Sequence, residues 1–221
     1  MRSGEFRERV VFLAAGADIA LAANQVDQLE AYYQLLSRWN RRINLTALPL
    51  EPLADRTLAR LLIEPLAAAR YVPESPLEWV DVGSGGGSPA IPLRILRPLA
   101  RLTLIEARSR KAAFLREIVR GLGLTEVSVV NARFAEFAVT FDSSRVAALV
   151  TVRAIKADKA LFSAADAVLQ PDGQVFLFGA QNLAPEMWVS SFGEVRRLQL
   201  LPGSSSMLLI LKRSTWNTER R

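Results

Sequence analysis

The sequence predicts an α/β fold, with a mostly parallel seven-stranded sheet that ends in an antiparallel hairpin and follows an N-terminal helical extension. Three observations predict it. From residue 77 onward, five short apolar runs alternate with helical patterns, as in βαβ units. Two further runs near the C-terminus have no helix between them and are expected to pair antiparallel. Before residue 74 the apolar periodicity is helical.

The N-terminal extension is expected over residues 1–73, followed by the sheet-bearing domain at 74–213 and a polar tail at 214–221. Asn24 is expected to cap a helix whose apolar residues recur at steps of three and four. Pro65 is expected to kink or divide a second helical pattern over residues 53–71. The stripe of the first helix consists of Val26, Leu29, Tyr33, Leu36, Trp39 and Ile43.

Each of the five apolar runs is short enough for one parallel strand. Gly121 to Gly123 marks the end of a crossover helix, and Pro171-Asp172-Gly173 is expected to form a turn before the fifth strand. The hairpin strands are expected at residues 195–201 and 207–211. The five runs are 77–82, 102–106, 127–130, 146–152 and 174–178, and the crossover helices between them are 89–97, 109–122 and 157–169.

A glycine-rich turn follows the first apolar run. It reads D-V-G-S-G-G-G-S-P over residues 81–89, and Glu106 closes the next run 19 residues after Gly87. Such a turn lets the backbone approach a nucleoside closely, and an acid after the second strand accepts hydrogen bonds from ribose hydroxyls. The spacing suits S-adenosylmethionine better than NAD, whose turn reads G-x-G-x-x-G, and no P-loop motif occurs. The order of elements is that of the class I S-adenosylmethionine-dependent methyltransferase fold.

The composition indicates a folded protein with an anionic partner. Apolar residues make up 50% and charged residues 23% of the chain, which is ordinary globular usage. The 28 Lys and Arg residues outnumber the 22 Asp and Glu residues, and this excess favours RNA or an acidic surface. Residues 10–23 superficially resemble a secretory leader, but Asp18 interrupts them, and no uninterrupted apolar run of 18 residues occurs. We therefore expect a cytoplasmic protein without a membrane span.

The chain contains neither histidine nor cysteine. Their absence removes the commonest metal ligands and the Cys/His and Ser/His nucleophilic pairs, so no metal site is expected. Methyl transfer from a sulfonium needs mainly proximity and orientation. Attack through a cysteine adduct, as in pyrimidine C5 methylation, is excluded, and residues 151–155 lack the N-P-P-Y pattern of many amine methyltransferases. A guanine N7 lone pair, which carries no proton, remains a compatible nucleophile.

Several segments together match the pattern of one known family. Residues 38–47 read R-W-N-R-R-I-N-L-T-A, similar to W-N-K-x-x-N-L-T, and residues 81–93 read D-V-G-S-G-G-G-S-P-A-I-P-L, similar to D-V-G-S-G-x-G-x-P-G-I-P-L. Weaker matches lie at 104–106, 109–111, 114–115, 133–137 and 152–154. Over nearly its whole length, the chain resembles the RsmG (GidB) family of 16S rRNA (guanine-N7) methyltransferases.

This resemblance implies an enzyme that uses S-adenosylmethionine and acts on 16S rRNA or the 30S ribosomal particle, without a membrane or a metal. It implies that Glu106 holds the ribose, that Phe134 and Ala135 frame the adenine, and that Arg153 is the catalytic residue at the pocket mouth. Two alternatives stay open, because Arg153 could pair with a nearby carboxylate and Phe134 could be a core aromatic. The implied cofactor contacts are Gly83, Ser84, Gly85, Ser88, Glu106, Phe134, Ala135 and Arg153.

Basic side chains on the extension and around the pocket are expected to contact RNA phosphates. Trp39 and Asn44 are expected to be structural, with the amide satisfying backbone groups. The expected phosphate contacts are Arg38, Arg41, Arg42, Arg60, Arg110, Lys111 and Arg153.

The chain departs from the family pattern at three places. Residues 60–65 read R-L-L-I-E-P where the family has R-H-x-x-D-S, Phe178-Gly179 replaces Lys-Gly, and three serines at 204–206 replace E-R-H. Each lost group is polar and is expected to face the rRNA. The apolar replacements at Leu61 and Phe178 favour a rival reading: a diverged relative that modifies another substrate, or a non-catalytic ribosome-binding or assembly factor. An NAD-linked oxidoreductase is a third possibility.

Overall fold

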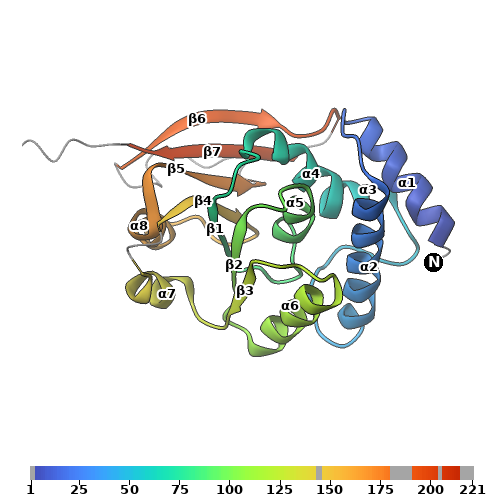
Figure 1. The fold of residues 1–221 in the computed structure, drawn as a ribbon, viewed down its shortest axis with the longest axis horizontal. Coiled ribbons are helices and arrows are strands. Elements are labelled where there is room, and N and C mark those ends of the chain that lie inside the picture. Colours follow the sequence, from blue (N-terminus) through green and yellow to red (C-terminus); the bar gives the residue numbers. More distant parts are fainter. Residues whose placement is uncertain (1–2, 143–145, 180–190, 204–205, 215–221) are drawn as a thin grey trace, which may run out of the picture.

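The computed structural model of the chain describes residues 3–142, 146–179, 191–203 and 206–214, so most of the expected tail lies outside the described residues. Seven strands form one sheet in the order β3-β2-β1-β4-β5-β7-β6 (Figure 1). The first five strands pair in parallel, and β7 pairs antiparallel with both β5 and β6, which confirms the expected topology class. The strands are β1 (Glu78–Val82), β2 (Arg101–Ile105), β3 (Val127–Val130), β4 (Ala147–Arg153), β5 (Leu169–Phe178), β6 (Phe192–Gln199) and β7 (Met207–Arg213).

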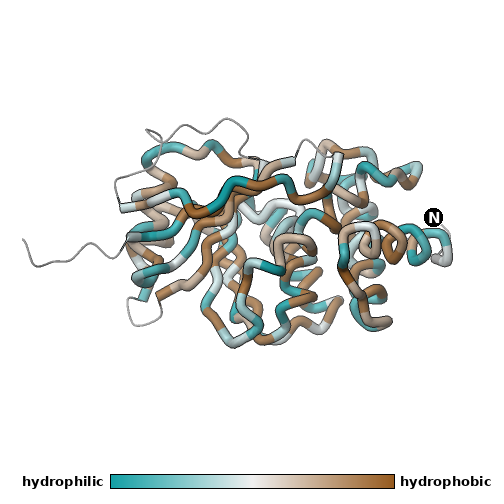
Figure 2. Tube along the Cα trace, turned by 90° about the horizontal axis from the view of Figure 1, so that it is seen from above, coloured by the Kyte–Doolittle hydropathy of each residue, from teal (hydrophilic) through white to brown (hydrophobic). Residues whose placement is uncertain are grey.

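Helices cover both faces of this sheet and create two hydrophobic clusters. Alternate side chains of one strand point to opposite faces, so Trp79 belongs to one cluster and its neighbour Val80 to the other. Figure 2 shows brown, hydrophobic stretches along the strands and helices, with teal, hydrophilic residues between them. The helices are α1 (Ser3–Ala15), α2 (Ala23–Asn40), α3 (Asp55–Leu58), the π-helix η1 (Ala59–Ile63), α4 (Glu64–Ala68), the 3-10 helix η2 (Ala69–Tyr71), α5 (Ala90–Leu96), α6 (Ser109–Gly121), α7 (Phe134–Thr140) and α8 (Lys159–Val168).

The N-terminal helices share one core with a face of the sheet. Leu29 and Leu36 of α2 and Leu62 of η1 are buried in the same cluster as Trp79 and Phe114. This cluster fixes the helices against α5 and α6, above the carboxyl ends of β1 and β2. The division of the chain at residue 73 stays a prediction. Within the described residues, no helix combines the length and apolarity that a membrane span requires.

Pro65 divides the second helical segment as expected. It occupies the first turn of α4, and the π-helix η1 directly precedes it. Proline lacks an N–H and its ring crowds the preceding turn, so the regular helical hydrogen bonding changes at this point. The expected cap at Asn24 is wrong, because α2 begins one residue earlier and Ala22 occupies the N-cap position. Ala22 has no polar side chain to cap the helix. The Gln25 side chain instead accepts a hydrogen bond from the Ala22 N–H at 2.9 Å.

Three other elements differ from the expectation. The helices α1 and α7 have no counterpart among the expected elements. The expected turn at Pro171-Asp172-Gly173 is an irregularity inside β5, whose pairing with β4 jumps from Leu169 to Gln174. Asp172 has a φ of 64°, a left-handed conformation that lets the extra residues bulge out without ending the strand.

Candidate functional site

The glycine turn and Glu106 lie at the same edge of the sheet. Val82 at the end of β1 is paired with Ile105 at the end of β2, so the residues that follow both strands are neighbours. Gly83 has a φ of 64°, and a Cβ atom there would lie 2.1 Å from Cδ1 of Ile155. Only glycine fits this position, since the left-handed conformation and the close approach both exclude a side chain.

The Glu106 carboxylate locks the turn to the second strand. Its Oε2 accepts a hydrogen bond from the Gly85 N–H at 2.9 Å, and its Oε1 accepts one from the Arg108 N–H at 2.8 Å. The residue is only 6% exposed. Each carboxylate oxygen has a second lone pair, so Glu106 can also accept hydrogen bonds from a bound diol.

Two cavities meet at Gly83, Glu106 and Lys111. The first has a volume of about 550 Å³ and lies between β2, α7 and Ile155. The second has a volume of about 410 Å³ and lies between the glycine turn and the segment that follows α2. The first is lined by Gly83, Glu106, Phe134 and Ala135, and the second by Gly83, Ser84, Gly85, Ser88, Glu106 and Arg153, so every expected cofactor contact lines one of the two.

Phe134 combines the two roles that its sequence context leaves open. It lines the first cavity and also packs against the hydrophobic cluster on the α7 and α8 face of the sheet. Its ring is therefore half-buried and held in one orientation by the core. A ring fixed in this way offers a rigid apolar wall to a planar ligand.

Arg153 lies in the wall of the second cavity, and it is not a free side chain at the pocket mouth. Its Nη2 donates to Glu64 Oε2 at 2.7 Å, and its Nη1 donates to the Arg60 carbonyl at 2.7 Å and to Ser88 Oγ at 3.0 Å. The guanidinium stacks on Phe178 at 4.8 Å from the ring centroid. Burial lowers the pKa of Arg153 to about 10, so the side chain is still charged at neutral pH.

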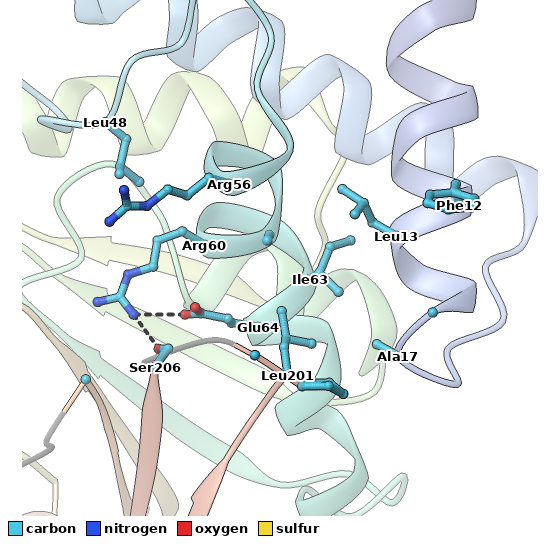
Figure 3. Close-up of a pocket in the computed structure, with 15 residues that line it drawn as sticks. Phe12, Leu13, Ala17, Leu48, Arg56, Arg60, Ile63, Glu64, Leu201 and Ser206 are labelled. Atoms are coloured by element: carbon cyan, nitrogen blue, oxygen red, sulfur yellow. Dashed lines mark hydrogen bonds and ion pairs between the residues drawn. The ribbon is translucent and has the colours of Figure 1, made fainter.

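Glu64 joins two arginines. Its Oε2 also accepts a hydrogen bond from Arg60 Nη1 at 3.0 Å, and the same Nη1 donates to Ser206 Oγ (Figure 3). Phe178 and Ser206 occupy positions where the sequence departs from the family pattern, and Glu64 stands at the acidic position of the departing segment 60–65. The three departures, far apart in the chain, therefore meet around Arg60 and Arg153. Ser204 and Ser205 lie outside the described residues.

Sequence reasoning missed Glu64, Tyr32 and the role of Asp81. Tyr32 donates a hydrogen bond from its hydroxyl to the Gly86 carbonyl at 2.7 Å and so ties α2 to the glycine turn. Asp81 Oδ1 accepts a hydrogen bond from Thr151 on the neighbouring strand β4, and burial raises the pKa of Asp81 to about 7. The available signal for the burial of Tyr32 was its spacing, three residues after Leu29 and four before Leu36 on the same helix.

The segment after α2 is organised by Asn40 instead of Asn44. Asn40 Oδ1 accepts hydrogen bonds from the N–H groups of Leu45 and Thr46 at 2.8 and 3.0 Å, whereas Asn44 is exposed. Trp39 packs against Phe114 of α6, with 5.7 Å between the ring centroids, which supports its structural interpretation. This packing carries the backbone of residues 45–48 over the glycine turn, where it lines the second cavity.

The expected phosphate contacts fall into two groups. Arg38, Arg42 and Arg110 are exposed, and Arg41 is exposed but pairs with Glu51 at 2.8 Å. The other three expected contacts, Arg60, Lys111 and Arg153, line the second cavity. Among the described residues, no group of three or more Asp and Glu side chains is arranged to hold a metal ion.

The sheet order, the glycine turn after β1 and the carboxylate after β2 define a class I methyltransferase fold. The yhhF protein of Escherichia coli, which carries a provisional description as a methyltransferase, shares this fold with a TM-score of 0.58. It is 15% identical, over 76% of this chain and 92% of that protein. Residues 25–192 match the family GidB, described as rRNA small subunit methyltransferase G, and the chain belongs to this family.

Curated relatives carry the name ribosomal RNA small subunit methyltransferase G. The Xylella fastidiosa (strain M23) protein is 36% identical over 210 residues, which cover 91% of this chain and 94% of that protein. The Pseudomonas aeruginosa (strain LESB58) protein is 42% identical over 128 residues. That match spans 57% of this chain and 58% of the length of that relative.

Proposed function

We propose that this chain transfers a methyl group from S-adenosylmethionine to N7 of a guanine in bacterial 16S rRNA, in the cytoplasm. The proposal rests on one observation above all: the Gly83 turn and the Glu106 carboxylate lie where two cavities meet. One cavity suits an adenosine and the other an approaching base. The family description and the names of the relatives support rRNA as the substrate class.

The residues around the first cavity fit an adenosine. Glu106 offers two carboxylate oxygens with free lone pairs toward ribose hydroxyls, and Phe134 and Ala135 offer an apolar wall to the adenine. The backbone at Gly83, Ser84 and Gly85 would hold the methionine portion beside them, because no side chain at Gly83 prevents close approach. Bound S-adenosylmethionine would supply an electrophilic methyl group.

Arg153 is the residue that we assign to the target base. Its two terminal nitrogens are held by Glu64, Ser88 and the Arg60 carbonyl, while its Nε has no hydrogen-bond partner among the described residues. Because this N–H is buried, Arg153 would act on the incoming base through its charge, which lies in the wall of the second cavity. Guanine N7 needs no proton removed, so orientation by Arg153 and exclusion of water by the surrounding walls suffice without a general base.

Ribosomal particles and free rRNA provide the direct test. The protein is incubated with labelled S-adenosylmethionine and either 30S particles or deproteinised 16S rRNA, and the labelled nucleotide is mapped. We expect label on N7 of one guanine and a steep fall of transfer with added salt, because arginine contacts to phosphates release counterions. Arg153→Gln should abolish most of the transfer, whereas Arg116→Gln, which changes an exposed arginine on α6, should not.

The second candidate function is that of a diverged relative with another role, and it predicts a different result in this test. The apolar side chains of Leu61 and Phe178 beside Arg153 are the observation that favours this second candidate. A chain that binds S-adenosylhomocysteine but labels neither 30S particles nor free rRNA would be such a relative. Binding to 30S particles without transfer would identify it as a non-catalytic ribosome-binding protein.

A further inference from the structure

A third cavity lies on the far side of Arg60 from the proposed transfer site. It has a volume of about 790 Å³ and is bounded by α1, by the helical segment from α3 to α4, and by residues 201–203 and Ser206 between β6 and β7 (Figure 3). Leu48 and Arg60 line both this cavity and the second one described above. The two spaces therefore adjoin along Arg60.

The lining combines an exposed aromatic ring with cationic side chains. Phe12 is 76% exposed, although a phenylalanine normally buries its ring. Arg56 is exposed and has no hydrogen-bond or ion-pair partner among the described residues. The carboxylate that lines the cavity, Glu64, is already bonded to Arg60 and Arg153, so it does not cancel the charge of Arg56.

Arg56 and Arg60 extend from the same side of the helical segment, as Figure 3 shows. They are four residues apart, a spacing that makes side chains neighbours on a helix. The π-helix η1 carries Arg60, and such distortions of a helix occur frequently at functional sites. Two neighbouring guanidinium groups suit a phosphate, and an exposed ring beside an apolar floor of Leu13, Ile63 and Leu201 suits a nucleobase.

We propose that this cavity binds a short unpaired stretch of the RNA, next to the nucleotide that enters the transfer site. A phosphate of this stretch lies between Arg56 and Arg60, and the base of a nucleotide further along stacks on Phe12 at the other end of the cavity. This inference rests on the proposed function, because it takes RNA as the substrate. It goes further in assigning a second nucleotide site to α1 and to residues 201–203 before β7.

The absence of cysteine from the chain allows a protection experiment. Pro202→Cys places a unique thiol on the rim of the cavity, and Leu99→Cys places one in the exposed loop before β2, away from all three cavities. Each variant is alkylated with iodoacetamide in the presence of a single-stranded RNA oligonucleotide of mixed sequence. Alkylation of P202C should slow in proportion to the fraction of protein bound, and alkylation of L99C should not change.

Binding of the same oligonucleotide is then compared among variants that each change one side chain and carry no added cysteine. Phe12→Leu keeps an apolar side chain but removes the ring, and should weaken binding about fivefold to tenfold. Arg56→Ala should reduce the slope of log binding constant against log salt by about 0.7, the value for one phosphate contact of a single strand. Arg116→Ala removes another exposed arginine, from α6, and should have a smaller effect on both quantities.

The outcomes separate this inference from the proposed function. Equal alkylation of P202C with and without RNA, or unchanged RNA binding by F12L and R56A, would overturn the nucleotide site. Failure of the unmodified protein to methylate 30S particles or free rRNA would instead overturn the proposed function, whatever the protection result. All variants are checked for S-adenosylhomocysteine binding. We expect this binding to be unchanged, because none of the substituted residues lines the two cavities that meet at Gly83 and Glu106.

Discussion

The Glu64 carboxylate binds the Arg153 guanidinium at 2.7 Å, although 89 positions separate the two residues in the chain. Both side chains are nearly buried, with 3% of Glu64 and 9% of Arg153 exposed. The pair connects the N-terminal helices to the end of β4. It therefore determines how the helical extension is positioned over the proposed transfer site.

Glu64→Gln should be strongly destabilising. It leaves the Arg153 charge buried without its counter-ion, and breaking a buried pair in this way costs about 3 to 5 kcal/mol. Glu51→Gln is the matched control, because the Arg41–Glu51 pair is 69% and 54% exposed and should contribute less than about 1 kcal/mol. The free energies of unfolding are measured by urea titration, and equal losses in both variants would contradict this account.

Tyr32→Phe should weaken cofactor binding more than its effect on stability explains. The lost hydroxyl donates to the Gly86 carbonyl, and its removal should cost about 1 kcal/mol of stability and loosen the glycine turn. Tyr33→Phe removes an equivalent hydroxyl, which donates to the Leu50 carbonyl at 2.7 Å away from the turn. Calorimetry with S-adenosylhomocysteine should show weaker binding for Y32F alone, and identical affinities would refute the link between α2 and the turn.

Gly83→Ala should abolish most cofactor binding. The new Cβ would displace Ile155 into the first cavity, in addition to about 1 to 2 kcal/mol of backbone strain at a φ of 64°. Gly123→Ala is the control for strain alone, since Gly123 has a φ of 61° and nothing within 4 Å of the added atom. We expect a larger stability loss in G83A than in G123A, and loss of cofactor binding in G83A alone. Binding retained in G83A would count against the proposed pocket.

Asp81→Asn should change the pH dependence of stability. Burial raises the folded-state pKa of Asp81 to about 7 from 3.8, so the folded protein binds more protons than the unfolded chain between these values. The stabilisation from protonated Asp81 is complete below about pH 4 and is lost as the pH rises through about 7. As the pH rises from 5 to 8, the wild type should therefore lose a few kcal/mol of stability relative to D81N, at roughly 1.4 kcal/mol per pKa unit. Urea titrations at pH 5 and pH 8 measure this shift, and parallel profiles would contradict it.

The sheet could be predicted from the sequence because its signals are local. Apolar runs, helical periodicity and the glycine turn each lie within a few adjacent residues, and parallel pairing brings Gly83 and Glu106 together without further information. The helix α7 was not predicted, although Phe134, Phe137 and Ala138 recur at steps of three and four and pack against the hydrophobic cluster on the α7 and α8 face of the sheet. With seven residues and none of them fully buried, the helix leaves a pattern that is too short to distinguish from a loop.

The contacts of Arg153 could not be predicted in the same way. Its partners are Glu64 and Ser88 side chains and the ring of Phe178, which are contributed by three separate segments. Their meeting depends on how the divided helix before Pro65 packs against the sheet, and no local pattern encodes that packing. The sequence did leave open that Arg153 pairs with a carboxylate, and the structure identifies that carboxylate as Glu64.

Titration of the protein with S-adenosylhomocysteine in a calorimeter tests the central claim most directly. The account predicts binding at one site per chain, about tenfold or more weaker binding by Glu106→Gln, because a charge-assisted hydrogen bond is lost, and no binding of NAD. An absence of heat with S-adenosylhomocysteine, or binding of NAD in its place, would contradict it.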